Sequence, residues 1–288
     1  SRMGELFDIV KHKFNANTLT GSRKNISAHY DLSNDLYKLF LDKEMQYSCA
    51  LWTKPEESLE EAQLNKMHSL LKKLKLKPGM KVLEIGSGWG KLAILAAKEY
   101  GVTVKSITLS EKQRELALEH AVEAGVSDKV EFALQDYRHE DGKYDRVLSV
   151  EMVEAVGHEN LGTYFKSIDK VLKKDGLAVI QAITIPDQKY DTYRKSCDWI
   201  QKYIFPGAVC PSLDALQTAM KSSSSLMIEN VENIGISYAR TLKEWNIRFH
   251  ESWKEIEALG FDDRFRRMWN MYLTSCASAF ESGYCDVT

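Results

Sequence analysis

The sequence predicts an α/β fold in which helices cover both faces of a mostly parallel, doubly wound sheet. Short runs rich in β-branched residues alternate with helical segments between residues 58 and 185. A glycine-rich turn follows directly after the first of these strands. Capping boxes also mark where several of the helices begin.

The predicted elements follow one another closely along the chain. The strands share runs of β-branched or alternating apolar residues, and they are expected at 81–85, 102–107, 130–134, 147–150 and 177–185. The helices share apolar residues three and four positions apart, and they are expected after Ser58, at 92–100, after Ser110, and at 161–172 with Gly176 as the stop. The capping boxes pair Ser58 with Glu61, Ser110 with Gln113, and Thr241 with Glu244.

Four regions divide the chain. Beyond residue 185 the strands give way to helices rich in aromatic residues, most of which we interpret as helix packing. The regions are an N-terminal helical cap over 1–60, a cofactor-binding core over 61–185, a lid or substrate-binding insertion over 186–240, and C-terminal helices over 241–288 that complete the core. The cap and the lid are expected to close over the ligand edge of the sheet.

The composition excludes several classes of protein. The chain has 288 residues, 39 basic and 41 acidic side chains and a formal net charge of -2, which does not indicate a nucleic-acid binder. No apolar run is long enough to span a membrane. The five cysteines are scattered without a CxxC pair, which indicates free thiols in a reducing compartment and no metal site. We therefore expect a cytoplasmic protein.

The glycine turn indicates which cofactor the core binds. Gly86, Gly88 and Gly90 follow the spacing GxGxG, whereas a dinucleotide site needs GxGxxG and Lys91 stands at its last position. The second strand also ends without the acidic residue that binds a ribose. S-adenosylmethionine has no pyrophosphate, so a compact turn beside its amino-acid part suffices. A purely structural turn would look similar, but this context favours the cofactor.

An acidic residue ends the third predicted strand. Asp136 could accept a hydrogen bond from the adenine amino group, with Tyr137 against the ring. Alternatively, Asp136 only caps the turn that follows, and Asp136 alone does not decide between the two interpretations.

Several stretches resemble the cyclopropane fatty acid synthase family, which includes the mycolic acid cyclopropane synthases. They keep the family's order over nearly the whole chain, and they are 28–37, 45–52, 82–90, 134–138, 202–207 and 210–212. The resemblance implies a Rossmann-like class I methyltransferase fold with helical cap regions. It also implies that the chain lacks the family's final β-strand after Thr288 and the extra N-terminal domain of longer members.

The resemblance carries over a set of residues that hold S-adenosylmethionine. These are Tyr47, Ser48, Gly86, Gly88, Gly90, Thr108, Leu109, Gln113, Asp136 and Tyr137. Gln113 thus has two compatible roles, as a helix cap and as a cofactor contact.

The family's reaction adds the methyl carbon of the cofactor to an alkene, and a bound bicarbonate then removes a proton so that a cyclopropane closes. The resemblance places Glu154, Tyr238 and the Cys49 region around the bicarbonate. Gln181 stands where the family has a histidine, and a glutamine can donate a hydrogen bond but cannot carry a proton. The cation needs a dry, aromatic-lined pocket.

The substrate implied by the resemblance is the unsaturated acyl chain of a membrane phospholipid. It implies peripheral contact with the membrane from the cytoplasmic side and is compatible with a homodimer. Three alternatives remain open: methylation of the same alkene without ring closure, N-methylation of a small amine, and an inactive binding protein. The intact glycine turn and Glu154 disfavour the last of these.

Overall fold

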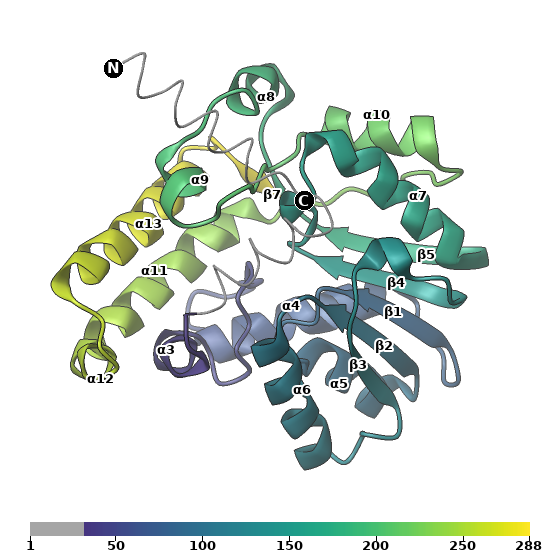
Figure 1. The fold of residues 1–288 in the computed structure, drawn as a ribbon, viewed down its shortest axis with the longest axis horizontal. Coiled ribbons are helices and arrows are strands. Elements are labelled where there is room, and N and C mark those ends of the chain that lie inside the picture. The colour runs from purple at the N-terminus through teal and green to yellow at the C-terminus, as the bar shows by residue number, and fades with distance from the viewer. Residues whose placement is uncertain (1–31) are drawn as a thin grey trace.

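A five-stranded sheet forms the centre of the computed structural model, which describes residues 32–288 (Figure 1). The expected features at 1–31, including the start of the 28–37 stretch, lie outside the described residues. The strands, in sheet order, are β3 (Val130–Leu134), β2 (Thr103–Thr108), β1 (Lys81–Ile85), β4 (Tyr144–Val150) and β5 (Leu172–Gln181). Every neighbouring pair is parallel, which confirms the predicted sheet. The connections change direction between β1 and β4, where open α/β sheets bind their ligands.

Helices cover both faces of this sheet. They are α4 (Leu59–Lys73), α5 (Lys91–Tyr100), α6 (Glu111–Glu123), α7 (Leu161–Val171) and α10 (Leu213–Ser223). On one face Val82 packs with residues of α4 and α5, and on the other its neighbour Leu83 packs with residues of α7. The alternation of side chains along a strand explains why adjacent residues enter opposite cores. The doubly wound arrangement is therefore confirmed.

The predicted caps at the starts of α4 and α6 are present to different degrees. Ser58 and Glu61 form both halves of a capping box. At α6 the Ser110 side chain accepts a hydrogen bond from the backbone N–H of Gln113, which is one half of the box. Each cap satisfies backbone donors that have no partner within the helix.

The segment after α7 differs from the prediction. Gly176, expected to stop the helix, lies inside β5, because the chain already turns extended at Leu172. The predicted strand 177–185 is also divided. Its last part is β6 (Ile183–Thr184), which leaves the central sheet and pairs antiparallel with β7 (Asp286–Val287).

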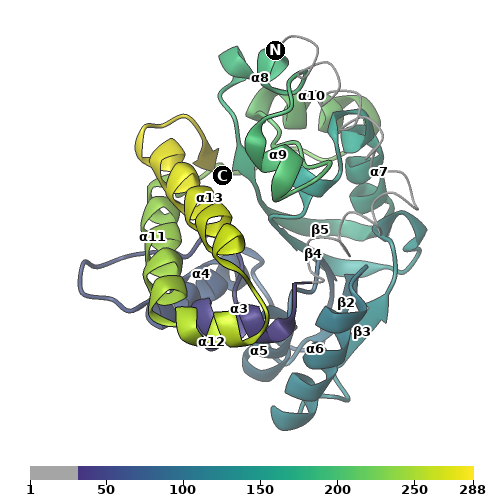
Figure 2. The same cartoon turned by 60° about the vertical axis from the view of Figure 1, so that its left-hand side comes forward.

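The C-terminal helices occupy the ligand side of the sheet, where they form a separate helical layer (Figure 2). They are α11 (Gly235–Glu251), α12 (Trp253–Ala258) and α13 (Asp263–Glu281), and they pack with α3 (Asn34–Phe40). The expected start of a helix at Thr241 is wrong, because α11 begins at Gly235 and runs through the boundary drawn at residue 240. Thr241 instead donates to the Ser237 carbonyl and accepts from the indole of Trp52.

Two short helices stand above the carboxyl ends of the strands. They are α8 (Asp187–Tyr193) and α9 (Trp199–Tyr203), and α9 faces α13 in both ribbon views (Figures 1 and 2). None of the helices described between residues 32 and 288 is long and apolar enough to cross a membrane. All five cysteines are free thiols, as the sequence predicts.

Candidate active site

Two cavities adjoin at the carboxyl edge of the sheet. The first has a volume of about 170 Å³ and contacts the glycine turn, and the second has a volume of about 290 Å³ and lies toward α9 and α13. Tyr47, Glu151 and Ala155 line both cavities. A ligand in the first cavity can therefore meet a ligand in the second at these side chains.

The first cavity collects nearly all of the residues expected to hold S-adenosylmethionine. Those that line it are Tyr47, Ser48, Gly86, Gly88, Thr108, Leu109, Gln113, Asp136 and Tyr137. Gly88 has a φ of 49°, and a Cβ there would meet nothing within 4 Å, so the turn leaves room that a ligand can fill. The residues present thus fit the cofactor.

Gly90, which the resemblance also places at the cofactor, is not among the residues that line the first cavity. A Cβ on Gly90 would lie 2.6 Å from the Phe132 ring and 2.8 Å from Ala117. With a φ of 89° it also precedes α5 in a conformation that favours glycine. Gly90 therefore allows α5 to pack closely against β3 and α6.

At the predicted adenine end of the first cavity, Asp136 caps a turn and also lines the cavity, which is compatible with both of its proposed roles. Its carboxylate accepts hydrogen bonds from the backbone and guanidinium of Arg138 and so caps a short 3₁₀ turn, Tyr137–His139. Burial alone would raise the pKa of Asp136, but the hydrogen bonds from Arg138 lower it. The ionised carboxylate still lines the cavity and can accept a further hydrogen bond.

Behind Ser48, which lines the first cavity, lies a buried lysine that sequence reasoning missed. The Lys66 ammonium donates to Ser48 Oγ and to Gln46 Oε1, each at 2.8 Å. Its side chain is 1% exposed. Burial lowers the pKa of Lys66, while the nearby carboxylates of Glu151, Asp42 and Glu84 oppose that shift. Lys66 thus fixes the cofactor-facing hydroxyl of Ser48.

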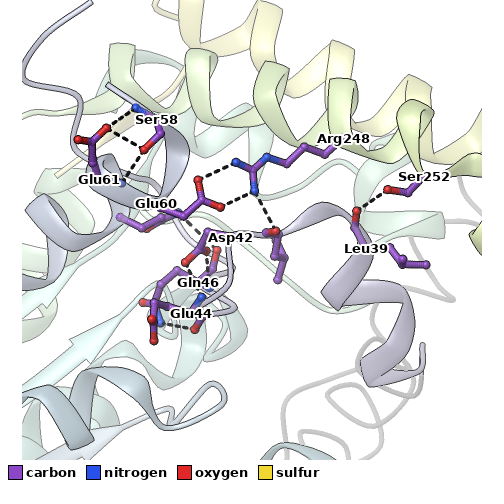
Figure 3. Close-up of polar contacts among 11 residues, drawn as sticks. Leu39, Asp42, Glu44, Gln46, Ser58, Glu60, Glu61, Arg248 and Ser252 are labelled. Carbon is purple, nitrogen blue, oxygen red and sulfur yellow. Dashed lines mark hydrogen bonds and ion pairs between the residues drawn. The ribbon is translucent and has the colours of Figure 1, made fainter. Parts of the chain in front are cut away.

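The loop that delivers Tyr47, Ser48 and Cys49 is anchored to α11 and α4 (Figure 3). The Arg248 guanidinium forms two hydrogen bonds to Glu60, at 2.7 and 2.8 Å, and a third to the Leu41 carbonyl. Such a bidentate pair fixes geometry as well as charge.

Within the same loop, the side chain of Asp42 accepts hydrogen bonds from backbone N–H groups. Its two carboxylate oxygens accept from the N–H groups of Glu44 and Gln46, at 2.9 and 2.8 Å (Figure 3). Ser252 donates to the Leu39 carbonyl at the end of α3. These contacts place the loop before any ligand binds.

Glu151 stands at the junction of the two cavities and receives three hydrogen bonds. Its Oε1 accepts from the backbone N–H of Cys49 at 2.8 Å and from Gln181 Nε2 at 2.9 Å. Its Oε2 accepts from the Tyr238 hydroxyl at 2.9 Å. Three of the four predicted catalytic positions therefore converge, but they converge on Glu151, which the sequence analysis did not select.

The sequence predicts that Glu154 binds bicarbonate together with Gln181 and Tyr238, but in the structure Glu154 shares no hydrogen-bond partner with them. Its Oε1 accepts from the backbone N–H of Ile183 at 2.5 Å, and its buried Oε2 has no hydrogen-bond partner among the described residues. Burial, and next the negative charge of Glu151, raise the pKa of Glu154 to about 8. Glu154 is therefore neutral near pH 7 and lines only the second cavity.

A sequence signal for Glu151 was available. It directly follows β4, and ligand-binding residues of open α/β sheets cluster at the carboxyl ends of strands. Its φ of 48° is unusual for a residue other than glycine. That conformation, which the sequence does not reveal, turns the Glu151 side chain back toward Gln181.

The second cavity is mainly apolar and aromatic. Its aromatic lining residues are Tyr47, Tyr193, Phe205, Tyr238, Tyr272, Phe280 and Tyr284. The hydroxyls of Tyr47 and Tyr272 are 3.0 Å apart and satisfy each other. Aromatic faces stabilise a positive charge and exclude water, so this cavity suits an apolar chain that becomes cationic.

The sheet order, the glycine turn and the cavity beside it define the Rossmann-like methyltransferase fold. A family model described as mycolic acid cyclopropane synthetase matches residues 17–288. The chain therefore belongs to this family.

Relatives at the same level of similarity carry different names. The tuberculostearic acid methyltransferase UfaA1 of Mycobacterium tuberculosis is 42% identical, over 92% of this chain and 64% of that protein. The cyclopropane-fatty-acyl-phospholipid synthase of Escherichia coli K12 is also 42% identical, over 88% of this chain and 63% of that protein. The chain thus spans just under two thirds of the length of these two relatives.

A solved structure supports the fold. The crystal structure of mycolic acid cyclopropane synthase CmaA1 in complex with SAH and CTAB superposes with a TM-score of 0.86 at 31% identity. The match covers 92% of this chain and 95% of that one.

Proposed function

We propose that this protein is an S-adenosylmethionine-dependent enzyme that adds the methyl carbon to the double bond of an unsaturated acyl chain in a phospholipid, and then closes a cyclopropane. The observation that carries this proposal is the meeting of a glycine-turn cavity and an aromatic cavity at one buried carboxylate, Glu151. The names of the two relatives, a tuberculostearic acid methyltransferase and a cyclopropane-fatty-acyl-phospholipid synthase, agree with it.

The first cavity would hold the cofactor, which supplies an electrophilic methyl group on a positively charged sulfur. Gly88 would leave space for its amino-acid part, since a Cβ there meets nothing within 4 Å, and Ser48 and Gln113 would offer polar atoms to it. Tyr137 offers an aromatic face at the adenine end. Tyr47, which lines both cavities, would border the point where the reactive ends of the two ligands meet.

The second cavity would hold the alkene and protect the cation. When the π electrons form the new C–C bond, the positive charge moves to the other alkene carbon. Tyr238 and Phe280, whose rings lie 4.7 Å apart, both line this cavity. Loss of one proton from the added methyl lets the C–H electron pair close the three-membered ring.

Glu151 is the base in this proposal. Its carboxylate already receives the hydrogen bonds from Cys49, Gln181 and Tyr238 that the family resemblance assigns to bicarbonate. A separate bicarbonate would have to displace it. Burial raises the pKa of Glu151, and the three hydrogen bonds oppose this. A positive charge brought into the first cavity favours the ionised form, which accepts a proton.

Methylation without ring closure is the second candidate, since one of the two equally similar relatives is named as a tuberculostearic acid methyltransferase. In that outcome the proton leaves from a neighbouring carbon, or the cation is reduced. N-methylation of an amine would need neither Glu151 nor an aromatic cavity.

Lipid analysis tests the function directly. The protein is expressed in a host that makes monounsaturated phospholipids, and their acyl chains are measured by mass spectrometry and proton NMR. Cyclopropane formation adds one CH₂ and gives upfield ring protons. A branched alkene has the same added mass but keeps vinyl signals, and an unchanged lipidome contradicts the proposal.

A second assay distinguishes Glu151 from bicarbonate as the base. With purified enzyme and vesicles, turnover should not change when dissolved carbon dioxide is removed and bicarbonate is added back. Turnover that falls on removal and recovers with bicarbonate would restore bicarbonate as the base and assign Glu151 to its site.

A further inference from the structure

We infer that the first cavity distinguishes S-adenosylmethionine from S-adenosylhomocysteine by the positive charge on sulfur, and that Glu84 releases a proton to balance that charge. This inference rests on the cofactor that the proposed function assigns to the first cavity, and it adds how the site tells the cofactor from its own product. It stands on the charges that line the cavity and on the hydrogen bonds of each buried acid.

The side chains that line the first cavity include acids but no bases. Glu84, Asp136 and Glu151 line it, whereas no lysine, arginine or histidine does so among the residues that the structure describes. The two ligands share an ammonium group and a carboxylate. They differ in one charge, because methyl transfer converts the sulfonium into a neutral sulfide. A cavity lined by acids alone responds to the charge that the reaction removes.

Glu84 differs from the other two acids in its hydrogen bonds. Asp136 pairs with the Arg138 guanidinium, and Glu151 accepts hydrogen bonds from three donors. Glu84, at 3% exposure, has one hydrogen-bond partner in the described part of the chain, the hydroxyl of Ser106. A buried carboxylate with so few donors is unfavourable. Glu84 is therefore the acid that keeps its proton before the cofactor binds.

The cation nearest to Glu84 is shared among several acids. The Lys66 ammonium donates its described hydrogen bonds to two neutral side chains of the loop that carries Cys49. Its charge acts on the carboxyl groups of Glu151, Asp42 and Glu84 together, and on the Cys49 thiol, whose pKa burial raises. One ammonium thus faces three buried carboxyl groups. This leaves Glu84 without a cation of its own.

This arrangement couples the protonation of Glu84 to methyl transfer. Burial raises the pKa of Glu84 to about 8, although the Ser106 hydrogen bond and Lys66 oppose the rise, so Glu84 is neutral near pH 7. A sulfonium in the cavity lowers that pKa, and the proton passes to the solvent. When the methyl group leaves, the neutral sulfide no longer stabilises the carboxylate. Glu84 then takes up a proton again, and the product is held less tightly than the cofactor.

Calorimetry of the wild-type protein tests the inference without lipid and without turnover. Titrations in buffers with different ionisation enthalpies give the number of protons released per bound ligand. At about pH 7, S-adenosylmethionine should release roughly one more proton than S-adenosylhomocysteine does. The preference for S-adenosylmethionine should also grow by about tenfold between about pH 6 and about pH 8, because Glu84 is then increasingly ionised before binding.

Two variants assign the released proton. In Glu84→Gln the side chain is neutral at every pH, so the extra proton and the pH dependence of the preference should both disappear. Glu154→Gln is the matched control, since Glu154 is also buried and has a pKa raised to about 8, but lines only the second cavity. This control should release the same extra proton as the wild type.

A further variant covers the case in which Glu84→Gln does not fold, as judged by circular dichroism. Ser106→Ala removes the hydroxyl that donates to Glu84 and so raises its pKa further. The rise in preference for S-adenosylmethionine should therefore move to higher pH than in the wild type. An unchanged position would show that another group releases the proton.

Three results would overturn the inference. They are equal proton release by the two ligands, a preference that does not change with pH, and an extra proton that persists in Glu84→Gln or is lost in Glu154→Gln. The proposed function fails separately. If the ligands differ as expected and no lipid product forms, the selection by charge stands without the lipid reaction, and a lipid product without this difference shows the reverse.

Discussion

At the scale of single residues, the function proposed here depends on which of two nearby carboxylates receives the hydrogen bonds of Gln181 and Tyr238. Glu151 accepts both, whereas Glu154 accepts only one, from the Ile183 backbone. The three hydrogen bonds of Glu151 therefore favour its carboxylate form against the burial that raises its pKa, whereas burial and the charge of Glu151 raise the pKa of Glu154 to about 8 and favour the neutral acid. Two acids three positions apart thus have different chemistry because their surroundings differ.

Glu151→Gln should lower turnover by about a hundredfold to ten-thousandfold, because an amide cannot accept the proton at neutral pH. The variant keeps an oxygen for one donor, so S-adenosylhomocysteine affinity measured by calorimetry should change only a few-fold. Glu154→Gln is the matched variant and should keep most of the activity. A fully active Glu151→Gln with an inactive Glu154→Gln would contradict this assignment.

Gly88→Val should prevent cofactor binding, with calorimetric affinity at least about a hundredfold weaker, because the side chain fills the first cavity. Gly79→Val provides the control. Gly79 also has a positive φ, at 82°, and space around its Cβ, but it does not line the first cavity. Both variants place a valine at a positive φ, so equal affinity losses would show that backbone strain, and not the cavity, decides the result.

The raised pKa of Glu154 makes stability depend on pH. The folded value of about 8 exceeds the ordinary value of 4.5, so the folded state binds more protons between these limits. The free energy of unfolding should therefore fall as pH rises through this window, by at most about 1.4 kcal/mol per pH unit from this group.

Urea unfolding of the wild type and of Glu154→Gln, at about pH 5.5 and about pH 7.5, measures this dependence. The wild type should lose more stability than the variant on going to the higher pH. A stability difference between the two proteins that stays constant with pH would show that Glu154 titrates normally in the fold.

At the scale of elements, the sequence predicts regular structure where local signals and packing agree. Ser58 caps a predicted helix, and the alternating residues form predicted strands. These elements are neighbours both in the sequence and in space. Thr241 shows the opposite case. Its hydroxyl is used by Trp52 and Ala50, nearly two hundred residues away, and these long-range contacts override the local cap pattern.

Within the candidate site, the residues around the cofactor were easier to predict than those around the catalytic carboxylate. The residues predicted to hold the cofactor, apart from Gly90, line one cavity, because they lie in short motifs at strand ends. The catalytic side needs Cys49, Gln181 and Tyr238 brought together from three distant elements around one carboxylate. The choice between Glu151 and Glu154 depends on a positive φ, which spacing alone does not encode.

The helices α8 and α9 are expected to move during turnover, since Tyr193 of α8 and Ile200 of α9 line the second cavity, which also contacts Glu151. Amide hydrogen exchange in residues 186–212 should slow when S-adenosylhomocysteine and lipid vesicles are added together. Exchange in β1 and β4 serves as the internal reference. If residues 186–212 show the same protection with and without ligands, these helices do not act as a lid.

At the scale of the whole molecule, the cavities lie between two separately packed halves. The sheet and its covering helices form two hydrophobic clusters, and the helical layer of α3 and α11–α13 forms a third. Glu151 and Tyr238 bridge the halves across the site, as do Glu60 and Arg248 beside it. A bound cofactor contacts both halves, because Tyr47 and Gly88 line the same cavity from opposite sides of this division.

Tryptophan fluorescence can report on the helical half separately from the rest of the fold. Each tryptophan of the chain belongs to the helical cluster or packs against it, and they are Trp52, Trp89, Trp199, Trp245, Trp253 and Trp269. Tryptophan fluorescence thus follows the helical half, whereas far-ultraviolet circular dichroism follows the whole fold.

S-adenosylhomocysteine should therefore raise the melting temperature seen by both probes. A ligand at a hundred times its Kd adds about 2.7 kcal/mol of stability, which corresponds to a shift of roughly 5–10 °C for a chain of this size. Because the ligand contacts both halves, the two probes should shift together. If circular dichroism shifts and tryptophan fluorescence does not, the cofactor stabilises the sheet alone. Tyr47 and Ser48 would then not contribute to its binding, and the loop that Arg248 anchors would have no part in holding it.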